Sequence, residues 1–321
     1  MRTFRFIPDH TRIGFMRWRV VCFALSGVVI LLSLVLAAYP GLNYGIDFEG
    51  GTLMEVQTPG PADLGAMRAT LTGLGLGSVA LQEFGESDDV LIRIQRQEGD
   101  DAAQQAAVTK VKAALDRMMP DGVNYRRTEF VGPKVSQELL SDGVMALGLS
   151  LVAVLVYIWF RFEWQYGIGA IAALVHDITS TIGFFAITRL QVDLSTVAAL
   201  LTIVGYSLND TVVIFDRVRE NLRRYKSMNM VELLDRSINE TLARTIMTSG
   251  TTLLALFALF FFGGEVIRGF TAAMIWGVFV GTYSTVYIAT PLLVYLNLRA
   301  IGAKEEAKAA KAPAKAKGAG A

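Results

Sequence analysis

Two carboxylates lie inside apolar stretches of membrane-spanning length: Asp177 in Ala170–Ile187 and Asp210 in Val192–Phe215. A carboxylate in hydrocarbon costs at least about 2.5 kcal/mol, so such residues face a protein interior or a water-filled cavity and often handle ions or protons. His176 precedes Asp177, and this pair can either take part in proton transfer or satisfy itself as a buried polar couple. These residue types predict a membrane protein with an ion- or proton-handling core.

Arg244 is the candidate basic partner of Asp210, and Asn209 adjoins the carboxylate in the chain. Asp210 lies roughly 8 Å inside the apolar boundary at Phe215, a depth within reach of a long side chain at the mouth of the fifth apolar stretch. Burial favours the neutral acid and a nearby guanidinium favours the carboxylate, so a contact that changes with conformation would let Asp210 bind and release a proton. Arg244 could equally be a basic anchor that extends to water.

Small and hydroxyl residues recur at helical spacing in the later apolar stretches, for example Thr245, Thr248, Ser249 and Thr252. Such residues let membrane helices approach closely and hydrogen-bond across the contact, so most of them indicate helix packing. The Gly277–Gly281 stripe is one expected contact surface for a partner protein.

Six apolar segments are long enough to cross a hydrocarbon core about 30 Å thick. They are Val20–Tyr39, Gly143–Phe160, Gly167–Ile187, Val192–Phe215, Ile246–Phe262 and Phe270–Leu296. The first could instead be a signal peptide, because Val35 and Ala37 form a weak cleavage pattern. Its apolar run exceeds the usual 7–15 residues or so of a signal peptide, which favours an uncleaved anchor.

Lysine and arginine cluster before the first span, in the loop 216–245 and after Leu296, whereas the opposite short loops hold only Arg189 and Arg268. Basic flanks stay in the cytoplasm, so both termini are expected there. The predicted organisation follows from this rule and from the six spans. It comprises a cytoplasmic segment 1–19, a first span 20–39, a periplasmic α+β domain 40–142, a bundle 143–296 that includes the cytoplasmic loop 216–245, and a cytoplasmic low-complexity tail 297–321.

The domain outside the membrane alternates strand and helix signals in the order βαββαβ, which predicts a ferredoxin-like fold. The expected elements are strand Thr52–Gln57, helix Pro61–Leu74, strand Val79–Phe84, turn Gly85–Asp89, strand Val90–Arg96, helix Asp101–Met118 and strand Val123–Val131. The domain shows no metal-ligand spacing, phosphate loop or nucleophile–base pair, so we expect a binding or mechanical module. The single cysteine, Cys22, lies in the first span, so the domain has no disulfide.

A glycine-rich segment joins the first span to this domain, and we call it the linker motif. It contains Gly45, Asp47, Phe48, Gly50, Gly51 and Thr52. Glycines permit positive φ angles and close backbone approach, so on physical grounds the motif is first of all a tight turn that leads into a strand.

Composition and motifs exclude several functions. The net charge of +1 gives no global basic surface for nucleic acid. Neither an HExxH zinc motif nor a GxSxG nucleophile elbow is present, so we expect no enzyme. Residues 216–244 are expected to form an amphipathic helix pair on the membrane surface, and the Lys/Ala-rich tail could contact anionic lipid or the ribosome.

The segment Gly205–Asn221 resembles the fourth-span signature of the SecF proteins, which belong to the SecD/SecF family of protein-export membrane proteins in the RND superfamily. The linker motif resembles the family's GIDF-x-GGT sequence. Val131–Pro133, His176–Asp177 and Arg244–Thr245 fit the same family.

This resemblance implies a fold and a function. The fold is six transmembrane helices of RND half-transporter type with a ferredoxin-like periplasmic domain, in the bacterial inner membrane. Together with SecD, the protein would use the proton motive force, with no cofactor, to promote late preprotein translocation. Asp210 would be the protonated carboxylate and Arg244 its basic partner, with Asn209, His176 and Asp177 completing the proton pathway. The implied partners are SecD, the SecYEG translocon and the translocating preprotein, with YajC a further candidate.

Two other functions fit the same residues. The chain could be a passive scaffold subunit of the translocon, with Asp210 as an assembly contact, or half of an RND-type small-molecule proton antiporter. An antiporter needs a large porter domain with a ligand pocket, and a domain of about 100 residues argues weakly against it.

Overall fold

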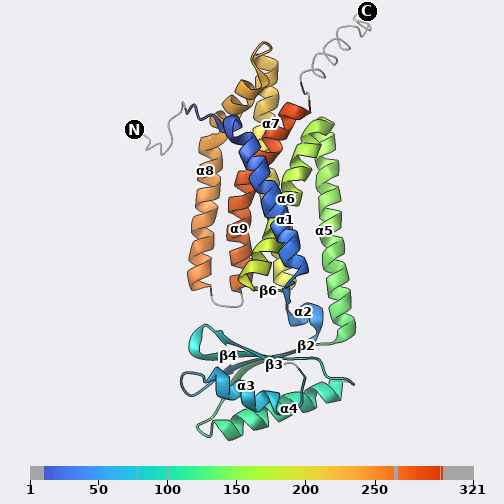
Figure 1. The fold of residues 1–321 in the computed structure, drawn as a ribbon, viewed down its shortest axis with the longest axis vertical. Helices are drawn as coiled ribbons and strands as arrows, with labels where there is room; N and C mark the ends of the chain where they lie inside the picture. The colour runs from blue at the N-terminus through green and yellow to red at the C-terminus, as the bar shows by residue number, and fades with distance from the viewer. Residues whose placement is uncertain (1–10, 78, 100, 264–266, 297, 299–321) are drawn as a thin grey trace, which may run out of the picture.

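The computed structural model of the 321-residue chain describes residues 11–77, 79–99, 101–263, 267–296 and 298. Long helices form a bundle, and a smaller α/β domain lies at one end of it (Figure 1). The predicted tail 297–321, except Leu298, and the first ten residues of the N-terminal segment lie outside the described residues.

Within the described residues, six helical segments are long and apolar enough to cross a membrane, as predicted. The first, Phe15–Ala38, joins a 3₁₀ turn Phe15–Trp18 to α1 Arg19–Ala38. The next four are α5 Pro133–Arg161, α6 Trp164–Thr188, α7 Leu194–Arg224 and α8 Met230–Phe262. In the last, Arg268–Tyr295, α9 Arg268–Ser284 continues through a π-helical stretch Thr285–Ala289 into α10 Thr290–Tyr295.

Helices α7 and α8 run well past their apolar parts. No Gly or Pro interrupts the chain between Phe215 and Arg224, so α7 continues unbroken into the first part of the predicted amphipathic helix pair 216–244. Leu233, Leu234 and Ile238 are buried, so this apolar face of α8 packs inside the protein. Residues 216–224 and 230–244 are thus an amphipathic helix pair, as predicted, formed by the continuations of α7 and α8. Contact of this pair with lipid stays a prediction.

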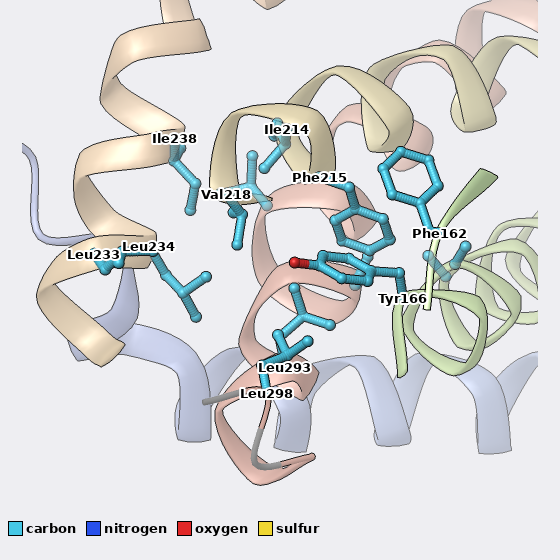
Figure 2. Packing of buried hydrophobic residues seen from close by; sticks show 14 of the residues in the cluster. Phe162, Tyr166, Ile214, Phe215, Val218, Leu233, Leu234, Ile238, Leu293 and Leu298 are labelled. Carbon is cyan, nitrogen blue, oxygen red and sulfur yellow. The ribbon is translucent and has the colours of Figure 1, made fainter. Parts of the chain in front are cut away.

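A buried apolar cluster packs where the helices meet at the end of the bundle away from the α/β domain (Figure 1), and Figure 2 shows its side chains. The rings of Phe162, Tyr166 and Phe215 pack together, with the Tyr166 and Phe215 centroids 5.0 Å apart in an edge-to-face arrangement. Leu234 and Leu293 extend the cluster to α8 and α10. Aromatic pairs in this geometry add stabilisation beyond their buried area, so this end fixes how α6, α7, α8 and α10 meet.

The α/β domain is a four-stranded antiparallel sheet with two helices on the face away from the bundle (Figure 1). Its elements are β2 Gly51–Gln57, α3 Leu64–Thr72, β3 Val79–Phe84, β4 Glu86–Ile94, α4 Asp101–Met118 and β5 Asn124–Val131. The strand order β3-β4-β2-β5 interleaves two βαβ units, because β4 lies between β2 and β3, and β2 lies between β4 and β5. The predicted ferredoxin-like fold is confirmed.

Several predicted boundaries in this domain were wrong, and two of the starts differ by three or four residues. Strand β4 begins at Glu86, so the hairpin turn reduces to Gly85. The φ angle of Gly85 is 89°, a value that glycine adopts readily and other residues rarely do. Helix α3 begins at Leu64 because the Asp63 carboxylate caps it, accepting hydrogen bonds from the backbone of Gly65 and Ala66.

Candidate functional site

Asp177 is the centre of a buried polar contact among three helices. Its side chain is 0% exposed, and its Oδ2 accepts hydrogen bonds from Ser207 on α7 at 2.6 Å and from Ser284 on α9 at 2.8 Å. The other oxygen, Oδ1, lies 3.1 Å from Nδ1 of His176. Both carboxylate oxygens therefore have partners inside the bundle.

His176 is buried beside Asp177 and packs against Tyr283 of α9, with the two ring centroids 5.9 Å apart. The hydroxyl of Tyr283 in turn donates to the carbonyl oxygen of Cys22 on α1 and lies 3.0 Å from the Ser26 hydroxyl. The structure brings the side chains of His176 and Asp177 together, as predicted. The geometry gives the pair the partners expected of a buried polar couple.

Asp210 lies on the next turn of α7 after Ser207 and has a different environment. It is 4% exposed, and Oδ1 accepts a long hydrogen bond of 3.4 Å from the Thr245 hydroxyl on α8. Its Oδ2 is buried with no hydrogen-bond partner among the described residues. Buried polar atoms are nearly always paired, so an orphaned carboxylate oxygen is a feature that calls for a functional reason. Protonation would remove the buried charge and would leave an O–H group that can donate a hydrogen bond.

The structure does not bring Arg244 and Asn209 into this buried contact. Helices α7 and α8 are neighbours, and Arg244 is close enough to act electrostatically on Asp210. Its side chain is nevertheless exposed, and within the described part of the chain no ion pair joins it to Asp210. Asn209 is also exposed. Both residues lie on surfaces of α7 and α8 that this chain leaves uncovered.

Several polar residues lie near the site that the sequence alone could assign only to helix packing. Thr211 on α7 lies 2.8 Å from the Thr285 hydroxyl, where the helix after Ser284 widens into the π-helical stretch. Thr290 donates to the Thr285 carbonyl, five residues back. The available signal was Pro291, which lacks an N–H and so disturbs the preceding turn.

The Gly277–Gly281 stripe packs inside the chain and is not a surface for a partner. A Cβ atom on Gly277 would clash with Ile203, and one on Gly281 would lie 3.1 Å from Cβ of Ser207. The glycines therefore let α9 approach α7 closely enough for Ser284 and Ser207 to share Asp177. The expectation of an intermolecular contact there was wrong.

The linker motif forms a short helix and a strand pairing, more than the single tight turn expected. Helix α2 spans Ile46–Glu49, and the preceding strand β1, Asn43–Tyr44, pairs in parallel with β6, Gln191–Val192, between α6 and α7. Asp47 reaches further along the same connection, and its Oδ2 accepts a hydrogen bond of 2.9 Å from the backbone N–H of Leu194.

Gly51 explains why glycine is needed at the end of the motif. Its φ is 124°, and a Cβ atom there would lie 2.6 Å from the carbonyl oxygen of Ile94 on the neighbouring strand. Thr52, the next residue, is fully buried at the start of β2, and Phe48 packs edge-to-face on Tyr44. The linker motif therefore leads from α2 directly into strand β2 of the sheet, with Gly50 alone between them.

These features define a polytopic membrane protein whose buried carboxylates lie in the helix bundle and whose α/β domain is attached through a glycine motif. Residues 110–299 match the family model described as protein export membrane protein SecD/SecF, C-terminal, and residues 40–58 match the SecD/SecF GG motif. The chain belongs to the SecD/SecF family of protein export membrane proteins.

Relatives of similar length carry the name protein translocase subunit SecF. The chain is 47% identical over 306 residues to that of Rhodobacter capsulatus, covering 92% of each protein. It is 44% identical over 289 residues to that of Rickettsia akari, covering 90% of this chain and 93% of the relative.

Solved structures of SecDF share the fold. The crystal structure of SecDF from Thermus thermophilus, described as a translocon-associated membrane protein, superposes with a TM-score of 0.81 at 33% identity and covers 91% of this chain. A structure of SecDF in a super-membrane-facing form gives a TM-score of 0.67 at 34% identity. The chain spans 40% of the length of each of these SecDF chains.

Proposed function

We propose that this chain is the SecF half of a SecDF-type export unit and that proton binding and release at Asp210 promotes late translocation of preproteins across the bacterial inner membrane. One observation carries the proposal. Asp210 is a buried carboxylate with one oxygen unpaired among the described residues, whereas both oxygens of Asp177 have partners. A group that exchanges protons must not be locked in either form by its neighbours, and Asp210 has a single long hydrogen bond among the described residues.

The contacts of Asp210 indicate how its charge acts on the bundle. The ionised form accepts a hydrogen bond from Thr245 on α8 and attracts the Arg244 guanidinium one residue earlier. The neutral form loses this attraction and can itself donate a hydrogen bond. Proton binding therefore changes how strongly α7 holds the middle of α8, which is the mechanical step that the proposal requires.

SecD is the proposed partner, on two grounds. The chain corresponds to less than half of the SecDF chains whose fold it shares. In addition, α7 leaves small and polar residues exposed at helical spacing, on the face next to Asp210, and such residues suit close helix packing. These residues are Ala198, Thr202, Gly205 and Asn209. SecYEG, the translocating preprotein and YajC are proposed from the family resemblance, as is contact of the tail with anionic lipid or the ribosome.

The proposed orientation places the α/β domain in the periplasm and the opposite end of the bundle in the cytoplasm. The charge distribution supports it, because Arg217, Arg219, Arg223 and Arg224 lie on the part of α7 beyond the apolar core, at the end away from the α/β domain.

Asp210→Asn tests the function. The amide keeps the shape of the side chain and cannot titrate. In inverted membrane vesicles that contain the native complex, we expect normal insertion and SecD binding but loss of the export that a proton gradient stimulates. Asp142→Asn, on an exposed carboxylate of α5, is the matched control and is expected to behave as wild type. Full gradient-dependent stimulation by Asp210→Asn would exclude the proposal. A passive scaffold predicts failed assembly and an assisted step that an uncoupler leaves unchanged.

A further inference from the structure

We propose that the linker motif is a mechanical joint that fastens the start of α7 to the α/β domain, with Asp47 as the residue that positions the helix. The inference rests on the proposed function of Asp210, because it concerns where a movement of α7 would be transmitted. It assigns a role to a motif whose sequence alone indicates only a turn into a strand.

Asp47 caps a helix to which it does not belong. The first turn of any helix has backbone N–H groups without intrahelical partners. At the start of α7, the N–H of Thr196 donates to Oδ1 of the local cap Asp193, while the N–H of Leu194 donates to Oδ2 of Asp47, at 2.9 Å in both cases. The linker motif thus supplies part of the cap that α7 needs, from 147 residues away in the sequence.

Backbone pairing reinforces this contact. The N–H of Gly45 donates to the Val192 carbonyl at 2.8 Å, next to the parallel pairing of β1 with β6. A Cβ atom on Gly45 would lie 3.3 Å from both the Val192 carbonyl oxygen and the Asp193 side chain, so glycine allows this close approach. Asn43 adds a hydrogen bond of 2.8 Å to the carbonyl of Arg189. The segment before α2 is therefore held to the connection between α6 and α7.

The other end of the motif is held to the sheet. Gly51 begins β2, a strand that is paired on both sides, with β4 and with β5. From β4, Arg93 donates to the Tyr44 carbonyl at 2.9 Å, and burial lowers the pKa of this guanidinium below its ordinary value without neutralising it near pH 7. Between the contacts with α7 and the central strand lies only the helical turn α2, so there is little slack.

The rest of the interface is open. A cleft of about 370 Å³ separates the free face of the sheet from the ends of α6, α7 and α9, with Leu53 and Gln82 on one side and Gln191 and Arg268 on the other. A second connection runs from β5 through Gly132 into α5. Helix α5 also packs on α7, near Val197. Among the described residues, the linker motif is the connection that supplies a hydrogen bond to the first turn of α7.

Helix α7 is long and continuous enough to act as a rod. Leu194 and Asp210 are 16 residues apart, or about 24 Å along a helix. A shift or tilt of α7 that follows proton exchange at Asp210 must move its capped end, and one of the two capping carboxylates, Asp47, belongs to the linker motif that leads into β2. Asp47 would thereby convert a change in the bundle into movement of the domain.

Hydrogen exchange of the full chain in its membrane complex tests this joint. Amide protection at residues 43–51 is compared in wild type, Asp210→Asn, Asp47→Ala and the double variant. We expect Asp210→Asn to change exchange in this segment by about fivefold, the effect of altering one cap interaction. In the Asp47→Ala background, the same substitution should have no effect. Asp47→Asn, which keeps an acceptor oxygen, should preserve the response.

Two further variants keep the test decisive. Asp63→Ala removes a cap inside the α/β domain and should leave the response to Asp210→Asn unchanged. Leu194→Pro removes the N–H that donates to Asp47 while leaving the motif intact, and should abolish the response if Asp47→Ala does not fold. Proline is well tolerated at the first helical position, and the preceding Asp193 already has the extended backbone that proline requires.

The outcomes separate this inference from the proposed function. If Asp210→Asn abolishes gradient-stimulated export but exchange at residues 43–51 responds equally with and without the Asp47 cap, the joint is wrong and the function stands. If Asp210→Asn leaves exchange in this segment unchanged in the wild-type background, the joint is also wrong. If Asp210→Asn retains full gradient-stimulated export, the proposed function is wrong on its own readout.

Discussion

The hydroxyl of Ser207 on α7 donates to Oδ2 of Asp177 on α6 at 2.6 Å, and Ser284 on α9 donates to the same oxygen. One carboxylate oxygen thus joins three helices. Ser207 is three residues before Asp210, so this contact sets the position of the α7 turn on which the candidate proton site lies. Asp177, with both oxygens paired, joins the helices, whereas Asp210, with one oxygen unpaired among the described residues, is the proposed proton site.

Removing Asp177 should destabilise the bundle more than removing any single donor. Hydrogen bonds between membrane helices average about 0.6 kcal/mol and reach about 1.7 kcal/mol, and because Ser207 donates to a carboxylate, Ser207→Ala should lower the free energy of unfolding by about 1 kcal/mol. Asp177→Ala leaves Ser207, Ser284 and His176 without their acceptor, and we expect a loss of about 3 kcal/mol. Unfolding of the full chain in detergent mixtures measures both.

Thr202→Ala is the control for this series, because among the described residues the Thr202 hydroxyl donates only to the carbonyl of Ala198 in its own helix. It should change stability by less than about 0.5 kcal/mol. Equal losses for Asp177→Ala and Thr202→Ala would show that Asp177 does not hold the helices together.

The six apolar helices and the βαββαβ order were predictable because both depend on local periodicity. Six apolar runs and an alternating strand Val90, Ile92 and Ile94 are visible without knowledge of any contact, and all three side chains are buried as expected. Element ends were less predictable. The cap at Asp63 and the one-residue turn at Gly85 depend on single hydrogen bonds and φ angles, which periodicity does not encode.

The identity of the polar partners could not be predicted from the sequence. Asp177 and Asp210 look alike as acidic residues in apolar runs, and only the arrangement of α6, α7 and α9 gives one of them two serine donors. For the same reason Gly277–Gly281 could be called a packing stripe, but not assigned to packing within the chain. The role of Asp47 was equally hidden, because its partner is a backbone N–H of a distant helix.

Two glycines on adjacent helices should respond oppositely to a large side chain. Gly281→Leu must displace Ser207, which lies 3.1 Å from the new Cβ atom, so we expect loss of the folded bundle. Gly205→Leu meets nothing within 4 Å in this chain and should leave the isolated chain folded. It should weaken copurification of SecD, because Gly205 lies on the exposed stripe of α7.

Gly148→Leu is the control for partner binding, since Gly148 is exposed on α5 and also has free space around it. It should affect neither folding nor copurification. Undiminished SecD binding by Gly205→Leu would exclude this face of α7 as the partner surface.

The α/β domain should fold when cut out as residues 43–136, because its buried cluster is built entirely from its own residues. Circular dichroism should show a cooperative thermal transition for this fragment. Val111→Ala, at a side chain that is 0% exposed, should lower its free energy of unfolding by about 2 kcal/mol. A disordered spectrum for the wild-type fragment would contradict the prediction.

Tyr125 makes the stability of this fragment depend on alkaline pH. Burial, and then its hydrogen bond to Asp116, raise the pKa of the Tyr125 phenol above its ordinary value. A raised folded pKa means that the contribution is complete below the unfolded pKa of about 10 and is lost as the pH rises towards the folded value. Tyr125→Phe should cost about 1 kcal/mol at pH 7, and the difference from wild type should shrink above pH 10.

Arg244 provides the remaining test of the site, because it acts on Asp210 by charge and not through a direct ion pair in this structure. Arg244→Met removes that charge while keeping an apolar stem of similar length, so we expect loss of gradient-stimulated export with normal insertion. Arg244→Lys keeps the charge and should retain a large part of the stimulation. Arg17→Met, at an exposed arginine before α1, is the control for lost basic anchoring and should have no effect. If Arg244→Met and Arg17→Met behave alike in the vesicle assay, Arg244 is only a topological anchor, and Asp210 must change charge without it.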